Sequence, residues 1–347
     1  MTNQNTIIEI DRAVFELRRG RAVQIDEQFF IHPEYIHSGN WAEISQAQPK
    51  LIITAKRAEN IFKKSPEKTF ESLVSIDVAK KDALYPSHII SGHVIMNEVE
   101  ASTISDKRAD AALRLARIAE LLPTMLQISS KNSLAKLAIK VRADDILNYK
   151  NMVNKTLELV AETPLKLKDA RNVVIKAFRP QNGGSEHLAI VIGDISKEPL
   201  IRVHSSCYTG DLLGSLACDC GDQLRTCIRL MDEAGGGVII YLIQEGRGIG
   251  LINKLRAYNL QTEGLDTVEA NEFLGFDDEE REFKPAAEIL QMLGIKTARL
   301  VTNNPRKAKD LQELGIKISV LVPLLVTHEH NQHYVETKGK KSGHKIN

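Results

Sequence analysis

Gly235-Gly236-Gly237-Val238-Ile239-Ile240-Tyr241-Leu242-Ile243 is the stretch that decides the fold of the C-terminal half. Its apolar run, Val238 to Ile243, lacks the alternation of a half-exposed strand and is typical of a strand covered on both faces. Helical and strand-like segments alternate from there to Val326. The pattern predicts an α/β fold, with helices packed against a sheet.

Two strand-like segments precede this run. Asn172–Phe178 and His187–Ile192 flank Pro180–Ser185, which is rich in turn-forming residues, so we expect a hairpin. Asp144–Val160 predicts a helix that Thr163-Pro164 closes, because the residue before a proline disfavours helical backbone. We place the domain boundary there, which gives an N-terminal domain of residues 1–162 and a C-terminal domain of residues 163–347.

The N-terminal domain has a different pattern, with short apolar runs among helical segments. Leu51–Thr54 predicts a strand ahead of a helix over Ala55–Phe62. Arg108–Leu122 has apolar residues at helical spacing and predicts a helix that Pro123 ends. We expect a mixed α and β domain.

Composition bounds the class of protein. A length of 347 residues suits two domains, and 43% hydrophobic with 26% charged residues is a soluble, globular balance. A net charge of +1 argues against a general affinity for nucleic acid or anionic membranes. Residues 1–11 are polar, and no apolar run approaches the length of a membrane span, so we expect a cytoplasmic protein. The lysine-rich tail Lys338–Asn347 is expected to be a solvated end.

The cysteines are the first clue to function. Cys207, Cys218, Cys220 and Cys227 fall in one short stretch, which in a reducing compartment favours metal binding or catalysis over disulfides. Alternate residues of an extended turn project to one side, so Cys218 and Cys220 could share a metal with Cys207. Three thiolates leave one coordination position open, as in catalytic zinc sites. The alternative is a set of buried free cysteines, and Cys227 is expected to lie in the core on a helix over Gln223–Met231.

The residues around the cysteines carry a resemblance to a known family. The chain resembles GTP cyclohydrolase II, and the matching motifs are His204–Asp211, Ser215–Gly221, Gln244–Leu251, Asn253–Tyr258, Asp266–Asn271, Gly275-Phe276, Glu280-Arg281 and Thr302–Pro305. The order of the motifs is specific, and together they cover nearly the whole C-terminal half.

The resemblance implies a reaction and a set of catalytic residues. Enzymes of this family open the imidazole ring of GTP, release formate and pyrophosphate, and leave a diaminopyrimidinone ribosyl phosphate that starts riboflavin synthesis. Zinc on Cys207, Cys218 and Cys220 is implied, with Tyr258, Glu279 and Arg281 as catalytic residues. Since a guanidinium stays protonated, we expect Arg281 to stabilise charge on the α-phosphate rather than to act as a nucleophile.

The resemblance also implies how GTP is bound. The implied substrate-binding residues are Arg202, Val203, His204, Ser205, Ser206, Gln223, Glu245, Gly246, Arg247, Thr267, Thr302 and Lys307. A buried carboxylate or amide can recognise the donors of guanine, while Arg247 and Lys307 can hold phosphates. Magnesium is expected with the triphosphate, and a homodimer is expected. The glycines around Arg247 do not form a dinucleotide fingerprint, so we expect no Rossmann site.

Three positions depart from the family pattern. Ser206 stands where the family usually has Glu, Ala217 where it has Arg, and Glu279 where it has Asp. Two alternatives therefore stay open: a ring-opening paralogue with a different substrate or product, and a catalytically silent nucleotide-binding regulatory protein.

The N-terminal half resembles a second enzyme faintly. Ala13–Val23, Leu51–Phe62 and Ala109–Leu122 are similar to 3,4-dihydroxy-2-butanone 4-phosphate synthase, which is often fused ahead of this cyclohydrolase. That synthase has a metal-binding acidic segment where this chain has Asp26–His32. Without clustered carboxylates to hold magnesium, we expect a degenerate scaffold with a role in dimerisation or regulation.

Overall fold

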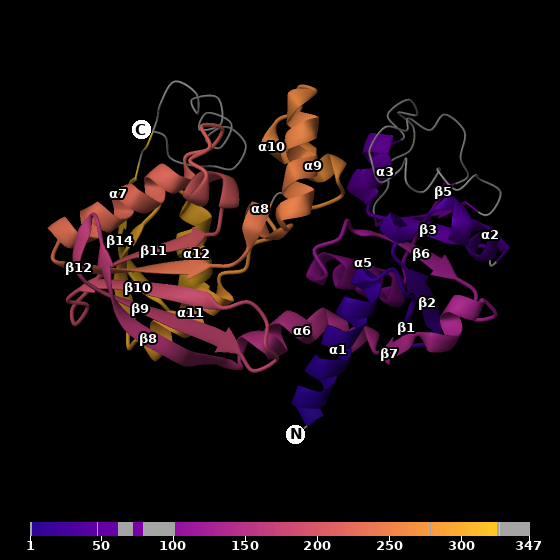
Figure 1. The fold of residues 1–347 in the computed structure, drawn as a ribbon, viewed down its shortest axis with the longest axis horizontal. Helices are drawn as coiled ribbons and strands as arrows, with labels where there is room; N and C mark the ends of the chain where they lie inside the picture. The colour runs from indigo at the N-terminus through magenta and orange to yellow at the C-terminus, as the bar shows by residue number, and fades with distance from the viewer. Residues whose placement is uncertain are drawn as a thin grey trace. The chain divides into compact units, whose positions relative to one another are not determined.

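The chain folds into two compact units, and each unit combines two separate stretches of the sequence. The computed structural model describes residues 2–46, 48–61, 72–78, 101–277, 279–324 and 326. Unit 1 comprises Met1–Met152 and Ile252–Glu280, and unit 2 comprises Val153–Leu251 and Arg281–Asn347. The chain therefore leaves unit 1 and returns to it before it completes unit 2 (Figure 1).

Unit 1 is built on a seven-stranded sheet with the strand order β5-β4-β3-β6-β2-β1-β7. Its strands are β1 (Val23–Ile25), β2 (Gln28–Ile31), β3 (Lys50–Ile53), β4 (Leu73–Asp77), β5 (Ala101–Ile104), β6 (Thr124–Ile128) and β7 (Ile139–Val141). The helices are α1 (Thr2–Arg18), α2 (Ser38–Gln46), α3 (Ala55–Ile61), α5 (Lys107–Ile118), α6 (Ala143–Asn154), α9 (Leu251–Thr262) and α10 (Thr267–Phe273), with the short turns η1 (Pro33–Tyr35) and η2 (Ser133–Leu137).

Both faces of this sheet are covered. Trp41 and Ile44 of α2 and Ala58 of α3 share a core with Leu51 and Ile53 of β3. Ile52, which points to the opposite face, is also fully buried. Helices α1 and α5 pack against each other and against strands of the same sheet. Among the described strands, β1 and β7 form a parallel pair and the other pairs are antiparallel.

Unit 2 contains a second seven-stranded sheet, ordered β14-β13-β11-β12-β10-β9-β8. Its strands are β8 (Leu157–Leu167), β9 (Ala170–Pro180), β10 (His187–Gly193), β11 (Leu200–Ser205), β12 (Gly236–Leu242), β13 (Thr297–Val301) and β14 (Lys317–Val322). The helices are α7 (Cys220–Glu233), α8 (Glu245–Gly248), α11 (Lys284–Met292) and α12 (Pro305–Glu313), and a π-helical turn, η3, spans Tyr208–Leu212.

The four strands β14, β13, β11 and β12 are parallel, whereas β10, β9 and β8 continue the sheet in antiparallel fashion. Val238 and Ile240 of β12 pack in a core with α11 and α12, while Ile239 packs with Met231 of α7. Figure 1 shows α7 on one side of this sheet and α11 and α12 on the other. The predicted α/β fold and the doubly covered strand are confirmed.

Other predicted elements are also present. The expected hairpin is β9–β10, in which Phe178 is paired with His187. The predicted strand at Leu51 is β3, and the helix after it is α3. The lysine-rich tail from Lys338 lies outside the described residues.

Two predicted helices are too long. The helix predicted over Asp144–Val160 ends at Asn154, and the chain enters strand β8 at Leu157. Thr163-Pro164, predicted to close that helix, lies in β8 instead and is paired with residues of β9. Because β8 is an edge strand, a proline there removes no essential ladder hydrogen bond. The domain boundary predicted at these residues thus falls inside a strand of unit 2.

The helix predicted over Arg108–Leu122 is also shorter than expected. Helix α5 ends at Ile118, and Glu120, two residues later, has a positive φ of 56°. Left-handed backbone terminates a helix without help from Pro123.

No helix in the described part of the chain combines the length and apolar character needed to cross a bilayer.

Candidate active site and metal centre

The candidate site of unit 2 lies where three neighbouring parallel strands end. Strands β13, β11 and β12 lie side by side and run in one direction, so their carboxyl ends meet at one edge of the sheet. Thr302 follows β13, Cys207 follows β11, and Glu245 follows β12. Ligand sites of α/β proteins form at this edge, because the loops there come from different strands.

The three cysteines predicted as metal ligands come together. The Sγ atoms of Cys207, Cys218 and Cys220 all lie within 4.8 Å of one another, and those of Cys207 and Cys218 are 3.8 Å apart. Two thiolates on a tetrahedral zinc ion, each about 2.3 Å from the metal, are about 3.8 Å apart. Among the described residues this is the single group of three or more potential metal ligands. The thiol spacing therefore fits zinc.

A glycine makes this spacing possible. A Cβ atom on Gly210 would lie 2.8 Å from Sγ of Cys218 and 3.1 Å from Sγ of Cys207. The backbone N–H of Gly210 also donates to the Cys207 sulfur at 3.3 Å. Turn η3 therefore closes the space beneath the thiols, and a side chain there would fill it.

Helix α7 places two of the thiols at its N-terminus. Cys220 is the first helical residue and Cys218 lies two positions before it, which corrects the prediction of an extended turn through both. Cys227 lies further along α7 in the hydrophobic core, where burial raises the pKa of its thiol to about 11. Cys227 lies outside the group of three thiols that could share a metal ion.

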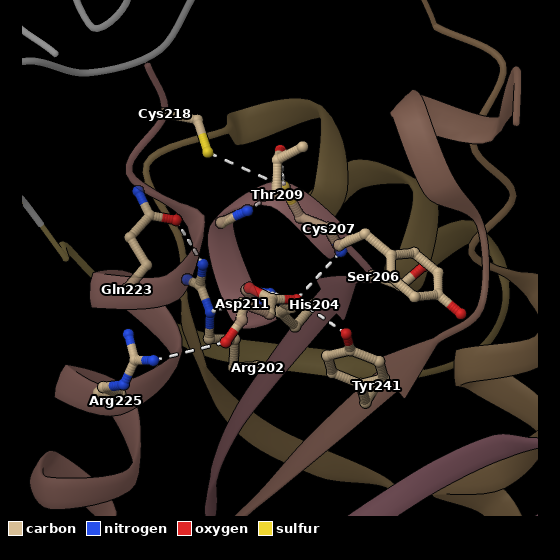
Figure 2. A network of polar contacts seen from close by, with 12 residues as sticks. Arg202, His204, Ser206, Cys207, Thr209, Asp211, Cys218, Gln223, Arg225 and Tyr241 are labelled. Carbon is tan, nitrogen blue, oxygen red and sulfur yellow. Dashed lines mark hydrogen bonds and ion pairs between the residues drawn. The ribbon is translucent and has the colours of Figure 1, made fainter. Parts of the chain in front are cut away.

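Asp211 organises the residues around Cys207 (Figure 2). Its carboxylate accepts hydrogen bonds from the backbone N–H of Cys207 at 3.0 Å and from the hydroxyl of Tyr241 at 2.8 Å. Nε2 of His204 lies 3.2 Å from both carboxylate oxygens. Burial and the neighbouring Asp211 raise the pKa of Tyr241, so its hydroxyl remains a donor. One carboxylate thus ties three strand and turn segments to the position of Cys207.

The neighbours of His204 determine its tautomer. Nε of Arg202, which can only donate, lies 3.4 Å from Nδ1 of His204. Nδ1 must therefore accept, and the proton resides on Nε2, where it is donated to Asp211. Burial lowers the pKa of His204, which keeps the ring neutral.

Arg202 extends this network to α7. Its Nη2 donates to Oε1 of Gln223 at 2.5 Å, and Nε2 of Gln223 donates to Asp219 at 2.6 Å. Asp219 is the residue between Cys218 and Cys220, directly before α7, and is buried. A polar chain therefore connects β11 to the residue between Cys218 and Cys220.

The loop after β12 carries three further predicted residues. Glu245 is buried, and its carboxylate accepts from the backbone N–H of Tyr208 at 2.7 Å. Gly246 and Arg247 both adopt left-handed backbone dihedrals, with φ of 62° and 60°. Such a conformation costs a non-glycine residue of order 1 kcal/mol or more, and it recurs at binding sites because the strain fixes a side-chain direction.

Three candidates of unit 2 that carry hydroxyl groups lie at the same strand ends. Ser206 is buried, and its hydroxyl accepts from the backbone N–H of Gln244, the neighbour of Glu245. Ser205 accepts from the Gln244 side chain. Thr302 is buried at the end of β13, with its hydroxyl bound to the N–H of Asn304. The hydroxyl groups of Ser205, Ser206 and Thr302 thus accept hydrogen bonds from residues in the loops at this edge of the sheet.

Two cations gather near the end of β11. Lys307 donates through Nζ to the carbonyl oxygen of Val203 at 3.0 Å. Lys307 and Arg281 both lie over the ring of Phe283, at 5.6 and 5.9 Å from its centroid. The side chain of Val203 is in the hydrophobic core, and its carbonyl oxygen is bound by Lys307.

Three predicted residues belong to unit 1. Tyr258 lies on α9, beneath the ammonium group of Lys254. Thr267 is the first residue of α10, behind Asp266, which forms a capping box with Glu269. Glu279 follows α10 near the end of the same segment.

The structure adds residues that the sequence reasoning did not select. Gly210 and Asp211 stood in the motif after Cys207, but only the fold reveals their contacts with the thiols and with Cys207. Tyr241 lies within the apolar run that predicts the doubly covered strand. The sequence does contain a sign of this contact. A tyrosine in a strand buried on both faces needs a hydrogen-bond partner for its hydroxyl.

The chain is similar to known proteins of one enzyme family. The GTP cyclohydrolase II family model matches residues 158–323. A GTP cyclohydrolase-2 from Azospirillum brasilense is 40% identical over an alignment 359 positions long, which covers 96% of this chain and 93% of that protein. A GTP cyclohydrolase-2 from Histophilus somni is 50% identical over 193 residues, or 55% of this chain and 89% of its own.

A longer relative matches over a shorter fraction of its length. The riboflavin biosynthesis protein RibBA of Bacillus velezensis is 44% identical over 227 residues, which are 64% of this chain and 56% of that protein. The match with the Azospirillum protein extends along nearly all of both chains. On that evidence, together with the family match over the site, the chain belongs to the GTP cyclohydrolase II family.

Proposed function

We propose that this protein hydrolyses GTP to a diaminopyrimidinone ribosyl phosphate, formate and pyrophosphate, as the first step of riboflavin biosynthesis. The observation that carries the proposal is the thiol triad at the ends of three parallel strands, in a chain of this family. Ring opening at neutral pH needs a strong nucleophile. Two hydrolyses and one phosphoanhydride cleavage account for the products.

Zinc is the proposed metal, held by Cys207, Cys218 and Cys220, and when bound it supplies a water of lowered pKa and a Lewis acid. Asp211 fixes the backbone of Cys207 and so keeps that thiolate in place. The N–H of Gly210 adds a donor to the Cys207 sulfur.

The polar groups of the site suit guanine and phosphate. Glu245 is a buried carboxylate of the kind that accepts from the N1 and N2 donors of guanine. Arg247 and Lys307 are the proposed phosphate ligands. Arg281 is proposed to stabilise charge at the α-phosphate as pyrophosphate leaves, because its guanidinium cannot readily give up a proton.

Tyr258 and Glu279 are proposed to move protons during ring opening, at the positions where the family has its catalytic tyrosine and acid. Magnesium is proposed to bind with the triphosphate. We further propose a cytoplasmic homodimer that uses GTP and no nucleic acid.

The proposal is tested with the purified full chain, zinc, magnesium and GTP. The expected products are formate, pyrophosphate and the pyrimidine, in equal amounts. Ring opening without formate release, or turnover of another purine nucleotide in preference to GTP, would instead identify a paralogue. Nucleotide binding without turnover would identify a regulatory protein.

A further inference from the structure

The segment that carries Tyr258 and Thr267 is held by the N-terminal part of unit 1. Helices α9 and α10 belong to the sequence of the C-terminal half, yet they form one compact unit with residues 1–152. The contacts that join them are polar, specific and in part fully buried. They fall into two groups, one at α9 and one at the end of α10.

The first group fixes α9 at Arg256 and Asn253, two and five residues before Tyr258. Nη1 of Arg256 lies 2.6 Å from Oε1 of Glu34, which belongs to turn η1. The same nitrogen donates to Oδ1 of Asn253 at 2.8 Å, and the amide of Asn253, which is fully buried, donates to the carbonyl of Glu120 at 2.9 Å. Arg256 is two residues before Tyr258, so Glu34 holds the helix close to that side chain.

Glu34 is itself held in place by a buried histidine. Its backbone N–H donates to Nδ1 of His32 at 3.2 Å, and Nε2 of His32 lies 3.0 Å from the carbonyl of Leu122. A carbonyl can only accept, so Nε2 carries the proton and the ring is neutral. Burial lowers the pKa of His32 to about 4, which keeps it neutral near pH 7.

The second group fixes the C-terminal end of α10. Arg57 of α3, which is 1% exposed, donates to the carbonyl of Phe273 and lies over its ring, 5.3 Å from the centroid. Phe273 is the last helical residue, where carbonyls lack partners within the helix and a cation is favourable. Burial lowers the pKa of Arg57 to about 10, so it remains charged at neutral pH.

The chain after α10 packs closely on the same place. The hydroxyl of Thr54 donates to the carbonyl of Gly275 at 3.2 Å. Gly275 has a φ of 91°, and a Cβ on it would lie 3.1 Å from that hydroxyl and 3.2 Å from Cγ of Pro123. Lys56 adds ion pairs at 3.2 Å to Glu272 and Asp277, which are partly exposed and contribute little.

We propose that residues 1–152 are a positioning scaffold for α9 and α10, and that Glu34 and Arg57 are the positioning residues through which the scaffold supports turnover. The inference rests on the proposed function, because it takes Tyr258 and Thr267 as members of the site. It gives the N-terminal part a task that requires no chemistry of its own. Misplacement of a catalytic group by about 1 Å can cost about 100-fold in rate, which is why such a scaffold matters.

The test uses the full chain with Glu34→Gln and Arg57→Met. Glu34→Gln keeps the shape of the side chain, so it remains informative if Arg57→Met folds poorly. In both variants, amide hydrogen exchange across residues 251–273 should rise about 10-fold, while exchange in α7 and zinc content stay at wild-type values. The kcat for GTP should fall about 10- to 100-fold, with KM changed about twofold or less.

The matched control is Arg19→Met, which breaks an exposed ion pair with Glu16 in the same unit. It should change neither exchange in residues 251–273 nor kcat. Unchanged exchange in α9 and α10 in Glu34→Gln overturns the scaffold, as does raised exchange with a wild-type kcat. If the wild-type chain turns over no GTP, the proposed function fails, and exchange alone then decides whether residues 1–152 hold these helices.

Discussion

Cys218 is the thiol whose loss best separates a metal centre from a buried cysteine cluster. Its sulfur lies 3.8 Å from that of Cys207, and its removal leaves two thiolates for the metal. We expect purified Cys218→Ser to contain much less than one zinc per chain, as measured by metal analysis. Cys227→Ser, which alters a core thiol of helix α7, should keep its zinc. Undiminished zinc in Cys218→Ser would exclude Cys218 as a ligand.

Asp211 is expected to matter for zinc affinity although it is not a predicted ligand. Asp211→Asn replaces an acceptor by an amide that turns N–H groups toward the donors of His204, Cys207 or Tyr241. Loss of such an outer partner weakens metal binding about 10- to 100-fold. Competition with a chelator measures the affinity. Asp232→Asn, at the surface end of α7, should leave it unchanged.

Substitutions of Arg281 and Tyr258 are expected to impair different steps of the reaction. Arg281→Ala should slow pyrophosphate release about 100- to 1,000-fold and keep zinc, since it removes charge stabilisation and no metal ligand. Tyr258→Phe should keep zinc and GTP binding and lose about 100-fold or more in turnover, because it removes one hydroxyl. Zinc content, GTP affinity, pyrophosphate and formate are measured for both. Wild-type pyrophosphate release or wild-type turnover, respectively, would refute the assigned role.

At the scale of elements, turn η3 and helix α7 must approach closely for the thiols to meet. Gly210→Ala places a Cβ within 2.8 Å of the Cys218 sulfur, so one of the two elements has to shift. Overpacking of this kind costs about 1–3 kcal/mol, and here we expect it to appear as weaker zinc binding in a chelator titration. Gly264→Ala, in unit 1, is the control: its φ of 103° strains an added side chain, but the added Cβ meets nothing within 4 Å, so it does not crowd the thiols. Equal zinc affinity in the two variants would contradict the close approach.

At the scale of the whole molecule, the N-terminal half is expected to have no synthase activity. Asp26 and Glu27 form the turn between β1 and β2, and the described residues contain no acidic group of three that could hold a metal. We expect no dihydroxybutanone phosphate from ribulose 5-phosphate and magnesium, measured by product analysis with the full chain. The prediction is contradicted if the wild-type chain forms this product and a substitution in unit 1 abolishes it.

The sequence by itself determined the α/β class, the hairpin, the doubly covered strand and the grouping of three cysteines apart from the fourth. These follow from local patterns: apolar runs specify burial, turn residues specify a reversal, and closely spaced thiols have few other uses. Pro164 shows the limit of such reasoning. A proline does end a helix, but only the sheet order reveals an edge strand that accepts it.

Tertiary structure alone decided the contacts that join distant residues. The carboxylate of Asp211 reaches Tyr241, 30 positions away, because β11 and β12 lie side by side in the sheet. Likewise Arg57 reaches Phe273 across 216 positions, so the chain divides into units that no linear boundary describes. Such contacts depend on strand order and helix packing, which arise from the free energy of the whole fold and leave no local pattern.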